Sequence, residues 1–133
     1  MFNRDGGPEP PVGMYVPKAM YDDFVKITAP VKQIRPDYPF EIRIREPRKR
    51  PTEYGGTDAS VFAVEGVPTL GFVTDDIKGY DFSYDEIWHT ERDLYTKNIP
   101  EYQEHTATVT AIVALGVANL DKQLSREGLY IEE

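Results

Sequence analysis

Two segments of this chain carry side chains of the kinds that bind zinc in hydrolytic enzymes. Asp5 supplies a carboxylate near the start of the chain, and His89 supplies an imidazole in a segment that continues to Asp93. A carboxylate and an imidazole from separate loops can hold a metal ion with one coordination position left for a water molecule, which the metal activates for hydrolysis. From spacing alone, the favoured interpretation of His89 is a structural histidine, with Asp93 placed to hold its loop or its ring.

The other histidine, His105, lies among acidic and amide residues near the start of a helical segment. The simplest prediction for it is a solvated position on the helix surface. A pair of zinc ions needs roughly five protein ligands, one of them a bridging carboxylate. This chain has only two histidines and no cysteine.

The composition is that of one ordinary globular domain. Its 133 residues are 40% hydrophobic and 12% aromatic, enough for a single core. The net charge of -8 argues against nucleic acid as a partner. The absence of cysteine excludes disulfides and thiolate metal sites, and no apolar run predicts a signal peptide or a membrane span. One basic cluster, interrupted by prolines, is predicted to be a solvated loop; it consists of Arg43, Arg45, Arg48, Lys49 and Arg50.

The first part of the chain predicts a strand, a helix and a second strand. Residues 12–16 are a short apolar run, which indicates a buried strand. Residues 19–31 have apolar side chains at helical spacing, and Asp22 and Asp23 in the first turns suit the helix dipole. Residues 40–44 alternate apolar with charged side chains, which is typical of a half-exposed strand near the edge of a sheet.

The second part predicts a short helix, a strand, a long loop and a long helix. Thr57 or Asp58 can cap the short helix, which would end at Gly66. Residues 67–73 are a continuous apolar run, which predicts a fully buried strand. The loop at residues 74–88 is of a length that is often functional, and the last helix, from Pro100 to about Leu124, is predicted to be largely buried. This alternation indicates a single α/β unit over residues 1–133, with helices on both faces of the sheet.

Four motifs follow one another in a fixed order along the chain. They are Asn-x-Asp at residues 3–5, Gly-Thr-Asp at 56–58 with Phe62 four residues on, Glu-Gly-Val-Pro-Thr-Leu-Gly-Phe at 65–72, and Trp-His-Thr-x-x-Asp at 88–93. Together with the long C-terminal helix they resemble the C-terminal half of the co-catalytic dizinc exopeptidases, which are aminopeptidases and glutamate-carboxypeptidase-like enzymes. The resemblance covers residues 3 to about 124. It implies a three-layer αβα domain of the phosphorylase/hydrolase-like kind, with a mostly parallel sheet.

The resemblance also implies roles for individual residues. Asp5 matches the terminal carboxylate ligand of the family, and His89 matches the C-terminal histidine ligand, so the two would bind different zinc ions of the pair. Asp58 matches an acidic residue that we take as pocket-forming, although an ordinary helix cap is an equally good interpretation. Asp93 resembles the residue that supports the histidine loop, and Trp88 stands where some family members place a tyrosine that stabilises the oxyanion.

Part of the family pattern is missing from the chain. The family has an earlier His-x-Asp pair, whose Asp bridges the metals, and a Glu-Glu pair, whose first Glu is the general base. The chain has no His-x-Asp, and its only Glu-Glu is at residues 132–133. We therefore expect the C-terminal part of a zinc-dependent exopeptidase domain without the N-terminal half, and with no general base of its own.

The resemblance implies a function for the longer protein to which such a part would belong. Zinc-activated water would hydrolyse a terminal peptide bond of a peptide substrate, and the longer protein would be exported, as bacterial relatives commonly are. The chain alone is expected to bind zinc weakly and to be inactive. The alternative is a non-catalytic α/β module that keeps the fold and binds a partner or the missing half. In either case, sheet left uncovered would favour self-association.

Overall fold

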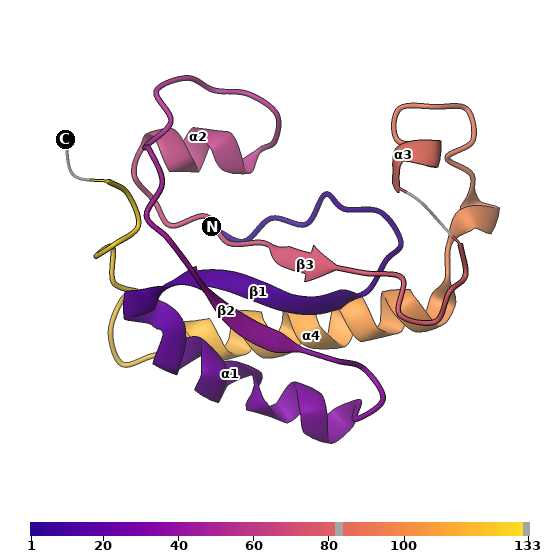
Figure 1. Ribbon diagram of the computed structural model, residues 1–133, viewed down its shortest axis with the longest axis horizontal. Helices are drawn as coiled ribbons and strands as arrows, with labels where there is room; N and C mark the ends of the chain where they lie inside the picture. The colour runs from indigo at the N-terminus through magenta and orange to yellow at the C-terminus, as the bar shows by residue number, and fades with distance from the viewer. Residues whose placement is uncertain (82–83, 132–133) are drawn as a thin grey trace.

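The computed structural model describes residues 1–81 and 84–131, and all structural statements concern those residues. Figure 1 shows a small sheet at the centre with two long helices beside it and two short helices above it. In chain order the elements are β1 (Pro11–Pro17), a 3₁₀ turn η1 (Lys18–Met20), α1 (Tyr21–Ile34), β2 (Glu41–Arg45), α2 (Ala59–Val64), β3 (Phe72–Thr74), α3 (Tyr84–Ile87), a 3₁₀ turn η2 (Tyr95–Lys97) and α4 (Pro100–Ala118).

The strands lie in the order β2-β1-β3, so the chain is mixed α/β with β1 at the centre of the sheet. Strand β1 pairs with β2 in parallel, with Met14 opposite Ile42, and with β3 antiparallel, with Met14 opposite Phe72. The sheet is therefore mixed rather than mostly parallel. Gly13 is required at its position because a side-chain carbon there would clash with the backbone oxygen of Glu41 on the neighbouring strand.

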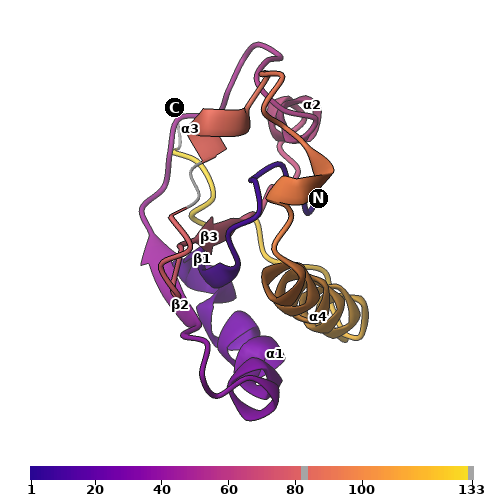
Figure 2. The ribbon, with the colours of Figure 1, turned by 90° about the vertical axis from the view of Figure 1, so that its right-hand side faces the viewer.

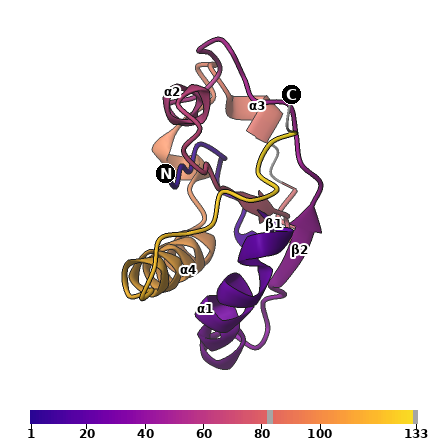
Figure 3. The ribbon, with the colours of Figure 1, turned by 90° about the vertical axis from the view of Figure 1, so that its left-hand side faces the viewer.

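Both long helices cover the same face of this sheet. Met14 and Val16 point from β1 into one core with side chains of α1 and α4, and Figures 2 and 3 show these two helices side by side. The opposite face carries Tyr15, which is 45% exposed. Among the described residues, the two long helices therefore lie on one face of the sheet, and the prediction of helices on both faces is not confirmed. The physical reason is that only one set of alternating side chains on β1 and β2 is apolar; Glu41 and Arg43 lie on the other.

The core lies between the sheet and the two long helices. Helices α1 and α4 approach closely, because Gly116 has no side chain where Ile27 packs. The buried members of the core are Met14, Val16, Met20, Phe24, Val31, Phe40, Leu70, Val109 and Val113.

The first strand, the first helix and the edge strand follow the predictions closely. Strand β1 extends one residue beyond the predicted run at each end, and β2 is at an edge of the sheet, as expected. Helix α1 continues past residue 31 to Ile34 with Pro30 inside it. Proline lacks the N–H for one helical hydrogen bond, so this extension depends on packing: Val31 is buried in the core.

The predicted buried strand at residues 67–73 is wrong. Only Phe72–Thr74 forms a strand, β3, and its residues are half-buried. Before it, Leu70 forms an isolated parallel bridge with Phe2, in which the Asn3 N–H donates to the Leu70 carbonyl at 3.4 Å. The Leu70 N–H also donates to the Met1 carbonyl at 3.1 Å, so this segment pairs with the first residues of the chain instead of lengthening β3.

The last helix is shorter and less buried than predicted. Helix α4 ends at Ala118 rather than near Leu124, and the Asn119 side chain donates to the Leu115 carbonyl at 3.0 Å at its end. Leu115 itself is 66% exposed. Only one stripe of α4 is buried, because the helix packs on one side of a two-layer structure; it consists of Tyr102, His105, Val109 and Val113. Within the described ranges, no helix has the length and apolar character needed to cross a bilayer.

Candidate functional site

The loop that carries Asp5 follows the short bridge between Phe2 and Leu70. The Asn3 side-chain amide donates a hydrogen bond to the Asp5 carboxylate at 2.8 Å, and this carboxylate is exposed. Arg4 folds back and donates to the carbonyls of Gly7 at 2.9 Å and Glu9 at 2.8 Å. Burial lowers the pKa of the Arg4 guanidinium, and the nearby carboxylates of Glu9 and Asp5 partly offset this. Asn3 and Arg4 therefore fix the shape of the loop around Asp5.

His89 lies directly after α3 in a left-handed backbone conformation. Its φ angle is 55°, which a residue with a side chain rarely adopts and which histidine adopts more readily than most. The indole of Trp88 stacks on the His89 ring with centroids 4.3 Å apart, and Tyr84 stacks on Trp88 at 6.2 Å. His89 and Trp88 are exposed. The aromatic stack and the turn set the direction of the imidazole while leaving it open to solvent.

Thr90 supports the histidine loop through its hydroxyl group. This hydroxyl is within hydrogen-bond distance of the carbonyls of Ile87 at 3.0 Å and Glu86 at 3.2 Å, and it accepts from the Arg92 N–H at 3.2 Å. Asp93 was expected to support the loop and contributes through its backbone, where its N–H donates to the Thr90 carbonyl at 3.2 Å. The supporting role of Thr90 was missed, although the residue is part of the motif that contains His89.

The Asp5 loop and the His89 segment come together at α3. A side-chain carbon on Gly7 would lie 3.1 Å from the ring of Tyr84, so the backbone of the Asp5 loop runs directly against the helix that leads to His89. On its other side, the Asp5 loop lines a hollow of 340 Å³ together with Asn98 and Gln103 at the start of α4. The structure thus places the Asp5 loop against the start of α3, the short helix that ends two residues before His89.

Asp58 occupies the N-cap position of α2. Its backbone is helical there, and its side chain makes no capping hydrogen bond within the described residues, so the interpretation as an ordinary helix cap is wrong. The Ser60 hydroxyl stabilises the turn before α2 instead, by accepting a hydrogen bond from the Gly55 N–H at 3.0 Å. The exposed Asp58 carboxylate therefore keeps its acceptor oxygens available at the entrance of α2, which stands above β3 in Figure 1.

Asp5 and His89 have the donor types that zinc prefers, a carboxylate oxygen and an imidazole nitrogen. Among the described residues, no group of three or more histidine, aspartate or glutamate side chains is close enough to hold a metal ion. The donor types of Asp5 and His89 suit a zinc ion, and two such donors alone would hold it weakly.

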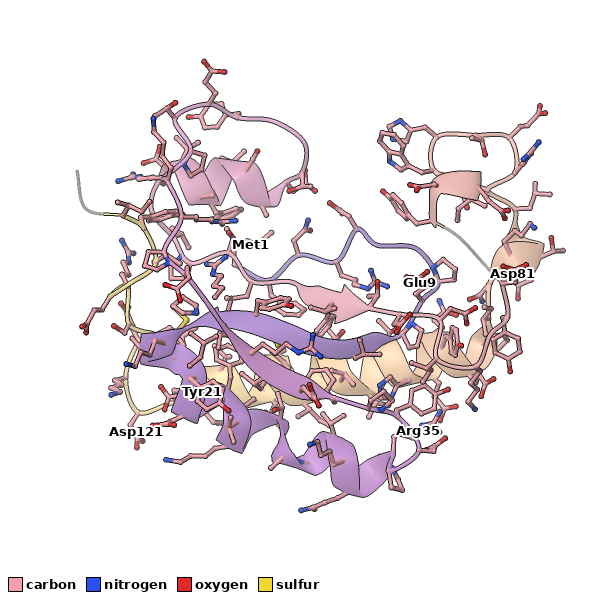
Figure 4. All side chains as sticks on the ribbon, viewed as in Figure 1. Met1, Glu9, Tyr21, Arg35, Asp81 and Asp121 are labelled. Carbon is pink, nitrogen blue, oxygen red and sulfur yellow. The ribbon has the colours of Figure 1, made fainter. Side chains whose placement is uncertain are left out.

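A polar network that the sequence analysis missed lies at the N-terminal end of α4. The Glu101 carboxylate accepts hydrogen bonds from Lys78 Nζ at 2.6 Å, from the Tyr38 hydroxyl at 3.3 Å and from the Tyr80 hydroxyl. These donors, Lys78 first, lower the pKa of Glu101. Figure 4 shows Glu9, Arg35 and Asp81 at this same end of the molecule. The network ties Lys78 and Tyr80 to α4 and to the turn before β2.

Tyr102 is the buried centre of that network. Its hydroxyl donates to Asp76 Oδ1 at 2.6 Å and accepts from the Lys78 N–H at 2.8 Å. Burial raises the pKa of Tyr102, and the hydrogen bond to Asp76 raises it further, so the hydroxyl keeps its proton. Asp76 Oδ2 in turn accepts from the N–H of Asp81, whose φ angle is 56°. Tyr102 thus holds the first part of the turn at residues 76–81, and Asp76 links it to Asp81.

The prediction that His105 is solvated is wrong. Its side chain is 1% exposed and stacks on the Tyr38 ring, with centroids 4.1 Å apart. Its Nε2 lies 3.2 Å from the carbonyl oxygen of Pro11, which can only accept, so Nε2 carries the hydrogen and donates. Nδ1 is buried with no hydrogen-bond partner among the described residues. His105 faces inward because it shares the buried stripe of α4 with Tyr102 and Val109.

We expect acid to destabilise the fold through His105. Burial lowers its pKa and the nearby Arg35 charge lowers it further, against opposing effects of the Pro11 hydrogen bond and Asp37. Because the folded-state pKa lies below the unfolded value, His105 contributes stability above about pH 6.5, and this contribution is lost as the pH falls through the folded-state pKa. Urea unfolding of the parent chain and of His105→Phe across this range measures the effect. The parent should lose more stability than the variant on acidification; parallel losses would contradict the prediction.

No protein-family model, no curated protein and no solved structure matches this chain. Function is therefore inferred from the motifs and the geometry described above.

Proposed function

We propose that this chain carries two metal ligands of a co-catalytic dizinc exopeptidase, Asp5 for one zinc ion and His89 for the other. The order of the four motifs supports the proposal, because each candidate residue falls in a loop where the family places it. The geometry adds support: Gly7, two residues after Asp5, packs against Tyr84 at the start of the helix that leads to His89, although the two segments are far apart in sequence. This contact is the observation on which the proposal chiefly rests, since ligands of neighbouring metal ions must come from adjoining loops.

Asn3, Trp88 and Thr90 orient the two proposed ligands. The Asn3 amide fixes one oxygen of the Asp5 carboxylate and leaves the other free to bind a metal ion. Trp88 and the turn at Thr90 set the direction of the His89 ring. When bound, the zinc pair would supply a water molecule activated for attack on a carbonyl carbon.

The remaining functions of such a site would come from outside this chain. A bridging aspartate and a glutamate that accepts a proton from the attacking water have no counterpart in the chain's motifs. The complementary segment would also cover the open face of the sheet at Tyr15 and complete a three-layer αβα domain. The substrate would be a peptide from which one terminal residue is released, and the longer protein would be exported.

The chain alone is expected to show no hydrolysis of aminoacyl or dipeptide substrates above background, with or without added zinc. The reason is chemical: a metal bound by two protein ligands is weakly held, and no glutamate base is present to take the proton. The measurement compares the purified chain with a longer protein in which it is joined to a segment that carries His-x-Asp and Glu-Glu. The longer protein should turn over the substrate and lose activity with a chelator.

Two results would contradict this proposal. Robust, chelator-sensitive turnover by the chain alone would show that it is not an incomplete site. A longer protein that folds and binds no zinc would favour the other function, a non-catalytic α/β module that keeps the fold and binds a partner.

A further inference from the structure

Strand β2 forms an open edge of the sheet. The order β2-β1-β3 places it at one side, and its outer backbone groups have no strand partner within the described residues. Such an edge can pair with a strand of another chain. Three of its five residues are exposed, including Ile44 at 47%.

The residues of this edge are complementary to themselves when they run antiparallel. The order from residue 40 to 44 is Phe-Glu-Ile-Arg-Ile, which is symmetric about Ile42 in its apolar positions and opposite in charge at its two polar positions. If two copies pair with Ile42 opposite Ile42, then Glu41 of each copy lies opposite Arg43 of the other. All apolar side chains then lie on one face of the joined sheet and all charged ones on the other.

The surface beside β2 offers space for the apolar side chains of a second strand. A groove of 440 Å³ lies between α1 and β2, lined by Val25, Phe40 and Ile42 among others. In the symmetric register, Ile44 of the second copy lies opposite Phe40, next to this groove. The pairing would bury Ile44, which is half exposed in the single chain, in both copies.

The charges on the other face also suit a second copy. Arg43 and Glu41 form an exposed ion pair at 3.0 Å within one chain, with side chains 56% and 60% exposed. Two such pairs related by a two-fold axis would form an alternating set of four charges, in which every guanidinium has a carboxylate on each chain. Pro39 directly precedes the 40–44 segment and has no backbone N–H to donate, so the paired segment is limited to a few residues.

We propose that two copies of this chain associate through antiparallel pairing of their β2 strands about a two-fold axis at Ile42. The contact is isologous, so it uses the β2 edge of both copies and closes at a dimer. The two three-stranded sheets become one continuous sheet, with α1 of each copy on the same face. The interface is independent of the metal site.

Charge reversal tests both the interface and its register. Glu41→Arg and Arg43→Glu each place like charges opposite one another in the symmetric dimer, so each variant is expected to be monomeric by sedimentation velocity at concentrations where the parent chain is dimeric. Mixing the two variants restores opposite charges at every facing position and is expected to restore a dimer. The double variant with both reversals is self-complementary again and is also expected to dimerise.

A matched control is Asp121→Arg, which changes the charge by the same amount at an exposed position beyond the end of α4 and should leave the dimer unchanged. Circular dichroism of each variant verifies folding. A monomeric parent chain at all concentrations overturns the proposal. A dimer that survives both single reversals overturns the β2 interface, and a mixture that stays monomeric overturns the register.

Discussion

In the longer, zinc-loaded protein, His89→Ala is expected to lower the turnover number by more than about a hundredfold. Even the loss of a group that only orients a metal ligand lowers metal affinity or activity by about 10–100-fold, and His89 is proposed to be a ligand itself. Loss of the imidazole would empty or displace one zinc ion and remove part of the activation of the attacking water. The fold should persist, because His89 is exposed and lies in a turn rather than in the core. The measurements are turnover number and zinc content of the purified variant.

The control for this experiment must be another exposed residue of the same loop. Glu91→Gln is suitable because Glu91 is exposed and makes no side-chain hydrogen bond or ion pair among the described contacts. His105→Ala would be a poor control, since His105 is buried and its loss would destabilise the fold. If the His89 and Glu91 variants both retain near-parental turnover and zinc content, His89 is a structural histidine and the metal assignment is wrong.

The elements predicted well from the sequence are those in which one physical signal dominates. In β2, apolar and charged side chains alternate, so the period of two is visible in the sequence, and β1 is a short apolar run of which most residues are buried. In α1, Phe24, Thr28 and Val31 recur at helical spacing on one buried side. Helix α1 and strand β2 each contact the core along one side only, so their apolar residues recur with the period of a helix or a strand.

The strand at residues 67–73 was predicted wrongly because an apolar run does not reveal its partner. Leu70 bridges to Phe2 and Phe72 pairs with β1, so the run is divided between two short pairings, and neither Val67 nor Val73 is fully buried. The same limitation explains the layers of the fold. Which face of a sheet a helix covers depends on chain paths that a hydrophobic pattern does not encode.

For the candidate site, the sequence offers candidate residues but does not predict how their surroundings are arranged in space. The motifs identified Asp5 and His89, and their order placed both in loops. The contact of Gly7 with Tyr84 could not be predicted, because it joins segments far apart in sequence. The environment of His105 was missed because neighbouring glutamates suggested an exposed surface, although Tyr102 and Val109 share its side of the helix.

The polar network around Tyr102 is expected to contribute strongly to stability. Truncation to alanine removes a fully buried aromatic side chain, and such changes cost about 3–5 kcal/mol in the free energy of unfolding. Tyr102→Phe keeps the ring and removes only the hydroxyl, which leaves the Lys78 N–H without its acceptor; this should cost about 1–3 kcal/mol. Urea unfolding of both variants separates the contribution of packing from that of the hydrogen bonds.

Tyr95 provides the matched control, because its ring is 91% exposed. Tyr95→Ala and Tyr95→Phe should each change the free energy of unfolding by less than about 0.5 kcal/mol, as surface substitutions usually do. In Tyr102→Phe, hydrogen exchange should speed up most in the turn at residues 76–81, since the hydroxyl bonds to Asp76 and to the Lys78 N–H. A Tyr102→Phe variant as stable as the parent, with unchanged exchange in that turn, would mean that Glu101 and its donors hold the loop without the tyrosine.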